Sequence, residues 1–200
     1  MSLTRRRLLA AALGLPLAGV PQLRAEEAAV ANGIFLIAKP ELSDPNFRET
    51  VVLVTQPEAG GGQLGVIVNR PLASRLSDAV PDLGVIPEAS QQMYSGGPVA
   101  QNRILFLLRA QSAPANSLRV LDEVYLTGDA QLPSRIARGE LAADMFRAYV
   151  GYAGWGQRQL RAEIAAGGWF MAPADADIIF ATETYKVWPE MIKRATQRVT

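Results

Sequence analysis

Short apolar blocks alternate with polar and glycine-rich segments along the chain. Blocks rich in β-branched and aromatic residues predict strands, and they cover residues 33–38, 50–55, 63–68, 103–108, 123–127, 146–152, 168–172 and 178–181. Apolar residues at helical spacing predict helices over residues 72–80, 132–142, 156–166 and 185–194. Adjacent strands mixed with short helices predict an α+β fold rather than regular βαβ alternation.

Two of the predicted strands, residues 50–55 and 63–68, are separated by Pro57 and by three glycines at 60–62. This arrangement predicts an antiparallel hairpin with a flexible loop. We find no internal repeat and no linker that would divide the rest of the sequence. Residues 26–200 are therefore predicted to form one domain.

The first 25 residues predict an export signal. Three arginines at 5–7 precede the apolar stretch 8–20, which has the length of a signal-peptide core and is too short to cross a bilayer comfortably. Residues 4–9 resemble the bacterial twin-arginine signal, which exports folded proteins. We expect cleavage after Ala25; cleavage after Ala31 has the better small-residue spacing but leaves almost nothing before the first strand. A general secretory signal and an uncleaved anchor are the alternatives.

Removal of this segment changes the charge of the protein. The whole chain carries a net charge of +1, but its first 25 residues hold four arginines and no acid. The remainder has 16 basic and 19 acidic residues, a net charge of −3. Its basic residues are scattered, whereas proteins that bind nucleic acid usually concentrate them on one face. We therefore expect no nucleic-acid partner.

The chain contains neither cysteine nor histidine. Disulfides, thiolate zinc sites, cysteine nucleophiles and every triad or metal site built on imidazole are excluded. A catalytic group would have to be a carboxylate, a hydroxyl group, a tyrosine or one of the three lysines at 39, 186 and 193. The sequence therefore indicates no metal site and no cofactor.

Several motifs together resemble the YqgE/AlgH family of bacterial proteins. Each is weak alone, but their order and spacing identify the family. In chain order they are Gly-Ile-Phe-Leu-Ile-Ala-Lys-Pro at 33–40, Asp-Pro-Asn-Phe at 44–47, Thr-Val-Val-Leu at 50–53, Gly-Val-Ile-Val-Asn-Arg-Pro at 65–71, Gly-Gly-Pro-Val at 96–99, Gly-Tyr-Ala-Gly-Trp-Gly at 151–156, Gln-Leu at 159–160 and Trp169. The matching residues run through almost the whole chain after the export segment.

The resemblance implies an α+β fold with a mixed, mostly antiparallel sheet and a small, partly barrel-like core surrounded by helices. It implies no reaction, and one family name derives from proposed transcriptional regulation of alginate production. The chain departs from the family pattern where members often carry histidines, at Gln56 and near Arg109. Members are also usually cytoplasmic, whereas this chain begins with an export-like segment.

Asn69 and Arg70 form the first candidate ligand site. They follow a predicted strand, and an amide beside a planar guanidinium suits an anionic ligand. The structural alternative, which we favour, is that Asn69 caps a turn and Arg70 pairs with a nearby acid.

Gly96 and Gly97 form the second candidate. Successive backbone N–H groups can bind an anion, but Pro98 has no N–H, so such a nest would be short. We favour a sharp bend between two strands.

Gly154, Trp155 and Gly156 form the third candidate. They lie where the glycine-rich motif at 151–156 predicts a tight turn from the strand 146–152 into the helix 156–166. The glycine amides would open the predicted helix 156–166 and attract an anion, and the Trp155 ring would stack on a flat ligand. The alternative, which we favour, places Trp155 and Tyr152 in the core, with glycines making room for the rings.

Asp175 and Asp177 lie two residues apart, which on a strand would place both carboxylates on one face. Without further ligands they favour a solvated turn over a cation site. We expect a non-enzymatic binding or accessory protein of the cell envelope, periplasmic or exported, with an unknown small ligand or protein partner and only transient membrane contact. The alternatives are a cytoplasmic location, a transcriptional regulator, or an enzyme using carboxylates or a lysine, with Asp177 and Lys39 as candidates.

Overall fold

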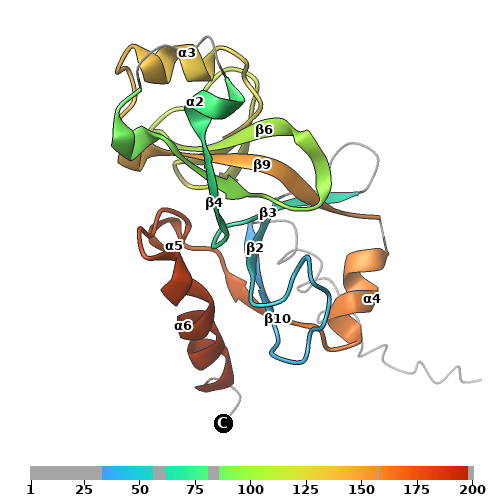
Figure 1. Ribbon diagram of the computed structural model, residues 1–200. Coiled ribbons are helices and arrows are strands. Elements are labelled where there is room, and N and C mark those ends of the chain that lie inside the picture. Colours follow the sequence, from blue (N-terminus) through green and yellow to red (C-terminus); the bar gives the residue numbers. More distant parts are fainter. Residues whose placement is uncertain (1–32, 56–61, 81–85, 157, 198–200) are drawn as a thin grey trace, which may run out of the picture.

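The computed structural model describes residues 33–55, 62–80, 86–156 and 158–197 (Figure 1). The predicted export segment, both cleavage positions, Gln56 and most of the glycine loop at 60–62 lie outside these ranges. The described residues form ten strands: β1 Ile34–Ala38, β2 Val51–Val54, β3 Gln63–Ile67, β4 Pro71–Arg75, β5 Gln92–Ser95, β6 Val99–Arg109, β7 Ser117–Leu121, β8 Val124–Thr127, β9 Phe146–Trp155 and β10 Trp169–Pro173. They also form five α-helices: α2 Leu76–Ala79, α3 Leu132–Ala137, α4 Gln159–Ala165, α5 Ala176–Ile179 and α6 Thr184–Gln197.

One curled sheet contains all ten strands, and eight of them follow the order β10-β1-β2-β3-β9-β6-β8-β7. All pairs along this path are antiparallel. The long strand β9 is shared by two parts of the sheet. Its C-terminal half pairs with β3, while its N-terminal half pairs in parallel with β5, which in turn pairs with β4. The predicted mixed, mostly antiparallel sheet is confirmed, as is the hairpin formed by β2 and β3.

The sheet curls into a half-barrel. Gly33, just before β1, lies so close to β7 that a Cβ on it would be 2.4 Å from the Val120 carbonyl oxygen. Strands near the two ends of the path therefore meet at this point. The interior of the curl is mainly apolar and includes the fully buried side chains of Phe35, Ile37 and Leu53. The partly barrel-like core implied by the family resemblance is confirmed.

Helices cover the faces that the sheet leaves open (Figure 1). Ile179 of α5 and Val187 and Met191 of α6 close the interior cluster. Helix α4 covers the opposite face of β1–β3 with Leu160 and Ile164. Helices α2 and α3 cover the far face of β6 and β9 with buried Leu76, Leu132 and Ile136. Each helix lies where apolar sheet surface would otherwise meet water, and burial of one large aliphatic side chain contributes about 1.5–3 kcal/mol.

Two predicted elements are wrong. Residues 72–80, predicted as one helix, divide into β4 and the four-residue α2, because β4 pairs with β5 and the Asp78 carboxylate accepts a hydrogen bond from the Arg75 amide at 2.8 Å. Residues 178–181, predicted as a strand, belong to α5 and the turn after it. The Asp175 carboxylate accepts a hydrogen bond from the Asp177 amide at 2.8 Å and so begins α5 as its N-cap. The two acids therefore do not share a strand face.

Candidate functional site

Asn69 binds the backbone of the segment before β2. Its side-chain oxygen accepts a hydrogen bond from the Val51 amide at 2.8 Å, and its side-chain nitrogen donates to the Glu49 carbonyl at 3.0 Å. Both polar atoms of this amide are engaged within the protein. The side chain joins the turn after β3 to the start of β2, which agrees with the structural interpretation of a capped turn.

Arg70 has a similar role. Its guanidinium donates to the carbonyl of Asn46 at 2.7 Å and to that of Arg48 at 3.0 Å. The predicted pairing of Arg70 with an acid is therefore corrected: its hydrogen-bond partners are backbone carbonyl groups. Partial burial, together with the positive charge of Arg48, lowers the pKa of Arg70. Asn69 and Arg70 thus hold the 44–49 loop against the sheet.

Gly96 and Gly97 lie at a crossing of two backbone segments. The segment from β5 to β6 passes across β9 here, since β5 and β6 pair with opposite edges of that strand. The Gly96 amide donates to the Val150 carbonyl at 2.8 Å, and the Gly96 carbonyl accepts from the Ile67 amide at 3.0 Å. The Gly96 amide is therefore bound within the sheet, which corrects the nest interpretation at that position.

The crossing also explains Gly151, the first glycine of the 151–156 motif. A Cβ on Gly96 would lie 2.2 Å from the Gly151 carbonyl oxygen, and a Cβ on Gly151 would lie 2.7 Å from the Gly97 carbonyl oxygen. Real side chains do not approach backbone atoms so closely. The Gly-Gly-Pro and Gly-Tyr-Ala-Gly motifs, more than fifty residues apart in sequence, are therefore two halves of one backbone crossing.

The rest of the 151–156 motif continues β9, so the expected tight turn is corrected to extended strand. Gly154 lies opposite Leu64 of β3. Gly156 is exposed, and its amide donates to the Gln159 side chain at 3.3 Å, just before α4. The role of Gly154 and Gly156 in binding a ligand stays a prediction.

Trp155 is 4% exposed and belongs to a cluster of three aromatic rings. It stacks on Phe47 with centroids 5.9 Å apart and meets Trp169 edge-on at 6.5 Å. The indole nitrogens of Trp155 and Trp169 donate to the same carboxylate oxygen of Glu163, at 3.0 and 3.2 Å. Tyr152 is only partly buried. The ring of Trp155 therefore packs inside the protein and is not open to a flat ligand.

The structure reveals a different cluster, on the interior face of β9. Arg147 is 8% exposed, and one of its terminal nitrogens donates to the Ala181 carbonyl at 2.5 Å. Its guanidinium lies over the ring of Tyr94, 4.5 Å from the centroid. Tyr149, two residues further along β9 and fully buried, has its ring centroid 5.7 Å from that of Tyr94. Three polar side chains from β5 and β9 thus meet beneath the segment that follows α5.

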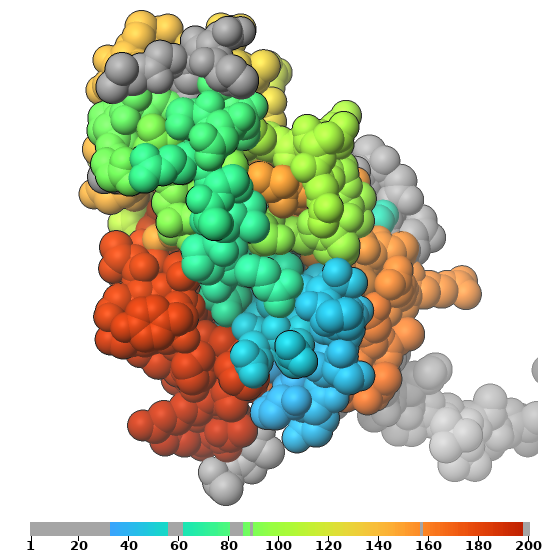
Figure 2. All heavy atoms as spheres, in the orientation of Figure 1, coloured from blue at the N-terminus to red at the C-terminus, as the bar shows by residue number. Residues whose placement is uncertain are grey.

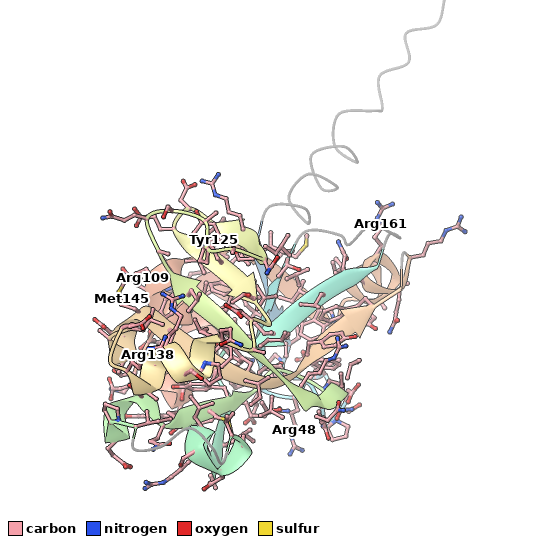
Figure 3. The ribbon with its side chains drawn as sticks, turned by 90° about the horizontal axis from the view of Figure 1, so that it is seen from above. Arg48, Arg109, Tyr125, Arg138, Met145 and Arg161 are labelled. Carbon is pink, nitrogen blue, oxygen red and sulfur yellow. The ribbon has the colours of Figure 1, made fainter. Side chains whose placement is uncertain are left out.

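Arg109 extends this cluster along β6. It lies two residues beyond Leu107, which is directly opposite Arg147, so both arginines project from one face of the sheet. Arg109 contacts the Asp177 carboxylate at 3.2 Å and lies over the Phe180 ring at 5.0 Å. We call Arg109, Arg147, Tyr94 and Tyr149 the arginine seam. Figure 3 shows that Arg48 and Arg161 lie well away from Arg109, so these three do not form one basic surface.

Three atoms of the arginine seam lack a hydrogen-bond partner among the described residues. They are the Nε atoms of Arg109 and Arg147 and the hydroxyl oxygen of Tyr149. Buried polar atoms are nearly always hydrogen-bonded in native proteins, so three in this region indicate a partner that the described residues do not supply. Burial lowers the pKa of Arg147, and burial raises the pKa of Tyr149 despite the opposing charge of Arg147.

Sequence reasoning missed the seam. An arginine and a tyrosine alternating with apolar residues in 146–150 suggest the outer face of a half-buried strand. Only the packing of α5 and of the segment after it over that face turns it inward. The one available signal was Arg109, because it stands near a position where members of the resembled family often carry histidine.

The free energy of unfolding of the unsubstituted protein is expected to fall at alkaline pH because of Tyr149, and Tyr149→Phe is expected to remove this fall. The raised pKa lets folded Tyr149 keep its proton above pH 10, where the tyrosine of the unfolded chain loses it. The contribution of this group to the free energy of unfolding then falls by about 1.4 kcal/mol per pH unit above about pH 10. Urea denaturation from pH 9 to 11.5 would measure the slope. Tyr125→Phe leaves Tyr149 in place and should keep the slope of the unsubstituted protein. An unchanged slope in Tyr149→Phe would contradict the expectation.

These elements define a class of structure: a curled α+β half-barrel that two C-terminal helices close. The AlgH-like family model matches residues 35–200, and the chain belongs to this family. Two UPF0301 proteins, from Methylococcus capsulatus and Marinomonas sp., are 39% and 37% identical. The matches cover 77% and 74% of this chain and 83% and 80% of those proteins. YqgE of Escherichia coli O1:K1 / APEC is 33% identical, over 80% of this chain and 88% of that protein.

Two solved structures have similar folds. The solution structure of AlgH from Pseudomonas aeruginosa is 28% identical, with a TM-score of 0.68, and the match covers 82% of this chain and 87% of that one. The crystal structure of DIP2367 from Corynebacterium diphtheriae has a TM-score of 0.67 at 24% identity, covering 82% and 86%. The predicted family and fold class are confirmed. The names of these proteins state no reaction, ligand or partner.

Among the described residues, no helix has both the length and the apolar character needed to span a membrane. No group of three or more acidic side chains within those ranges is arranged to hold a metal ion.

Proposed function

We propose that this protein is a non-enzymatic binding or accessory protein that acts in the cell envelope after export. The observation that carries the binding role is the arginine seam, whose three unpartnered atoms belong to two guanidinium groups and one phenol. Such groups donate hydrogen bonds to a ligand. A guanidinium stays protonated under ordinary conditions, so it serves recognition better than proton transfer.

The carboxylates that an enzyme would need are engaged elsewhere in ways that support this proposal. Asp177, the acid named as a catalytic candidate, pairs with Arg109 and has a side chain 90% exposed to solvent. Lys39 lies over the Phe170 ring, 4.7 Å from its centroid. Neither residue is buried, whereas catalytic groups usually lie in buried environments that perturb them.

The export part of the proposal is supported by the arginines at 5–7 and the apolar stretch after them. Replacement of both Arg5 and Arg6 with lysine is expected to keep the protein in the cytoplasm, because twin-arginine export depends on that pair. Fractionation of cells with an epitope-tagged chain would measure the change, with Arg24→Lys as the matched control. Cytoplasmic localisation of the unsubstituted chain would contradict export; equal export of both forms would indicate the general secretory route.

The binding role has a separate test. The purified protein, incubated with mixtures of common ester, amide, phosphate and glycoside substrates, is expected to turn none of them over. Turnover that a single substitution at Asp177 or Lys39 abolishes would overturn the non-enzymatic proposal.

A further inference from the structure

We infer that the arginine seam is the binding site for a small oxyanion, which engages Arg147 and Tyr149 from the interior side of β9. This inference rests on the binding role proposed above and names the chemical class of its ligand. The first argument is charge. Arg147 is 8% exposed, yet its hydrogen-bond partner is the Ala181 carbonyl, and no carboxylate among the described residues pairs with it.

A buried cation without a counter-charge is costly. Groups of this kind in native proteins are paired with an opposite charge or hold an ion. The two acids that flank Ala181 in the chain do not fill the role: Asp177 pairs with Arg109, and Glu183 pairs with Lys186. An anion bound to Arg147 would supply the missing charge.

The second argument is the direction of the free hydrogen bonds. Arg147 and Tyr149 project from the same face of β9, two residues apart, and both contact Tyr94. The Arg147 Nε and the Tyr149 hydroxyl are the unpartnered atoms. A guanidinium N–H can only donate, and a phenol can donate as well. Oxygen atoms of a phosphate or a carboxylate accept from both, and charge-assisted bonds of this type are the stronger ones.

Other occupants fit less well. A water molecule could accept these bonds but would leave the buried charge unbalanced. A metal cation would be repelled by two arginines. A neutral carbonyl group, that of Ala181, already accepts a hydrogen bond from one terminal nitrogen of Arg147, and it leaves the Nε atom without a partner. The oxyanion alone satisfies both the charge and the hydrogen bonds.

Access to the seam lies through the segment that covers it. Residues 180–183 connect α5, a helix of four residues, to α6, and residues of both helices and of this connection line a groove of about 320 Å³. Asp177, Ala181 and Glu183 line this groove. In Figure 2 the C-terminal segment forms a continuous red lobe against the green surface of the preceding strands. Local opening of this short helix would admit an anion without unfolding the sheet.

Inorganic phosphate is the probe for the test, with sodium chloride at equal ionic strength as the reference and acetate as the carboxylate arm. Phosphate is expected to raise the Tm of the full chain beyond the sodium chloride reference and to shift the side-chain Nε–H resonance of Arg147. Preference for acetate would assign the site to carboxylates, and tighter binding of glycerol 3-phosphate would assign it to a phosphorylated small molecule. All three results support an oxyanion site.

Tyr149→Phe is the decisive variant. It should fold at least as well as the unsubstituted protein in chloride, because it removes a buried hydroxyl that has no partner. It should bind phosphate about tenfold more weakly, since a hydrogen bond to a charged ligand is lost. Tyr125→Phe is the control and should bind within about twofold of the unsubstituted chain. Arg147→Met should not bind at all; if it fails to fold, Tyr149→Phe alone decides.

Three outcomes would overturn the inference. Equal stabilisation of the unsubstituted protein and Tyr149→Phe by phosphate would mean a general salt effect. Absence of any anion response, combined with binding of a neutral compound that shifts the Arg147 resonance, would reject the oxyanion but retain the binding role. If neither an anion nor a neutral compound gives a response, the binding role at this seam is rejected as well.

Discussion

Gly97→Ala is expected to prevent stable folding. A Cβ at this position would lie 2.3 Å from the carbonyl carbon of Tyr152 and 2.4 Å from the amide nitrogen of Ala153. Both are backbone atoms of β9 and cannot rotate away. Gly97 also has φ +149°, a conformation that residues with side chains rarely adopt. Overpacking and backbone strain together should cost at least about 4 kcal/mol, which is a large part of the stability of an ordinary domain.

Two other glycines separate the causes of this loss. Gly139 has φ +71° with open space around its Cβ position, so Gly139→Ala should show the conformational cost alone, about 1 kcal/mol. Gly156 has neither a positive φ nor a neighbour within 4 Å, so Gly156→Ala should be nearly neutral. Thermal and urea denaturation of the three variants would measure the order. Equal stabilities for Gly97→Ala and Gly156→Ala would contradict the backbone crossing.

The sequence predicted those elements whose signal is local. Strands β1, β2 and β3 are short, mainly apolar runs, and three glycines in the sequence lie between β2 and β3. Helix α6 follows an amphipathic pattern, and α4 was placed within three residues of its actual start. In these segments, periodicity and turn chemistry agree with the tertiary environment.

The errors arose where distant partners decide the conformation. β4 is extended because β5, which begins some twenty residues after it starts, pairs with it. α5 is a helix because Asp175 caps it, although 178–181 is apolar enough for a strand. The 151–156 motif was expected to turn, since glycines are common in turns. Its first glycine instead accommodates the backbone that crosses β9, and no local pattern reports such a crossing.

The candidate site shows the same division. Asn69, Arg70, Gly96 and Trp155 were singled out because their residue types are unusual in context, and the structure gives each a partner inside the protein. Arg147 was passed over because arginine on a strand normally faces water. The seam exists only once β5, β6, β9 and the C-terminal segment are assembled. The residues that are unusual in the sequence therefore have packing roles in this fold. Arg147, which is not unusual in the sequence, belongs to the best candidate for a binding site.

Trp155→Ala is expected to lower the free energy of unfolding by about 3–5 kcal/mol, the usual loss when a large buried ring is removed. The ring is 4% exposed, stacks on Phe47 and contacts Trp169. Truncation would open a cavity between α4 and the sheet, and Glu163 would lose one of its two indole donors. Urea denaturation followed by far-ultraviolet circular dichroism would measure the loss without relying on tryptophan emission.

Two further variants test the reason for this loss. Tyr185→Ala removes an aromatic side chain that is 71% exposed and should change stability by less than about 0.5 kcal/mol. Phe47→Ala should also destabilise the protein, and the double variant should lose less than the sum of the two single losses, because the rings contact each other. A melting curve of Trp155→Ala that matches the unsubstituted protein would place the ring in solvent. The third candidate site, with Gly154 and Gly156 beside an open indole, would then replace the arginine seam as the first place to look for a ligand.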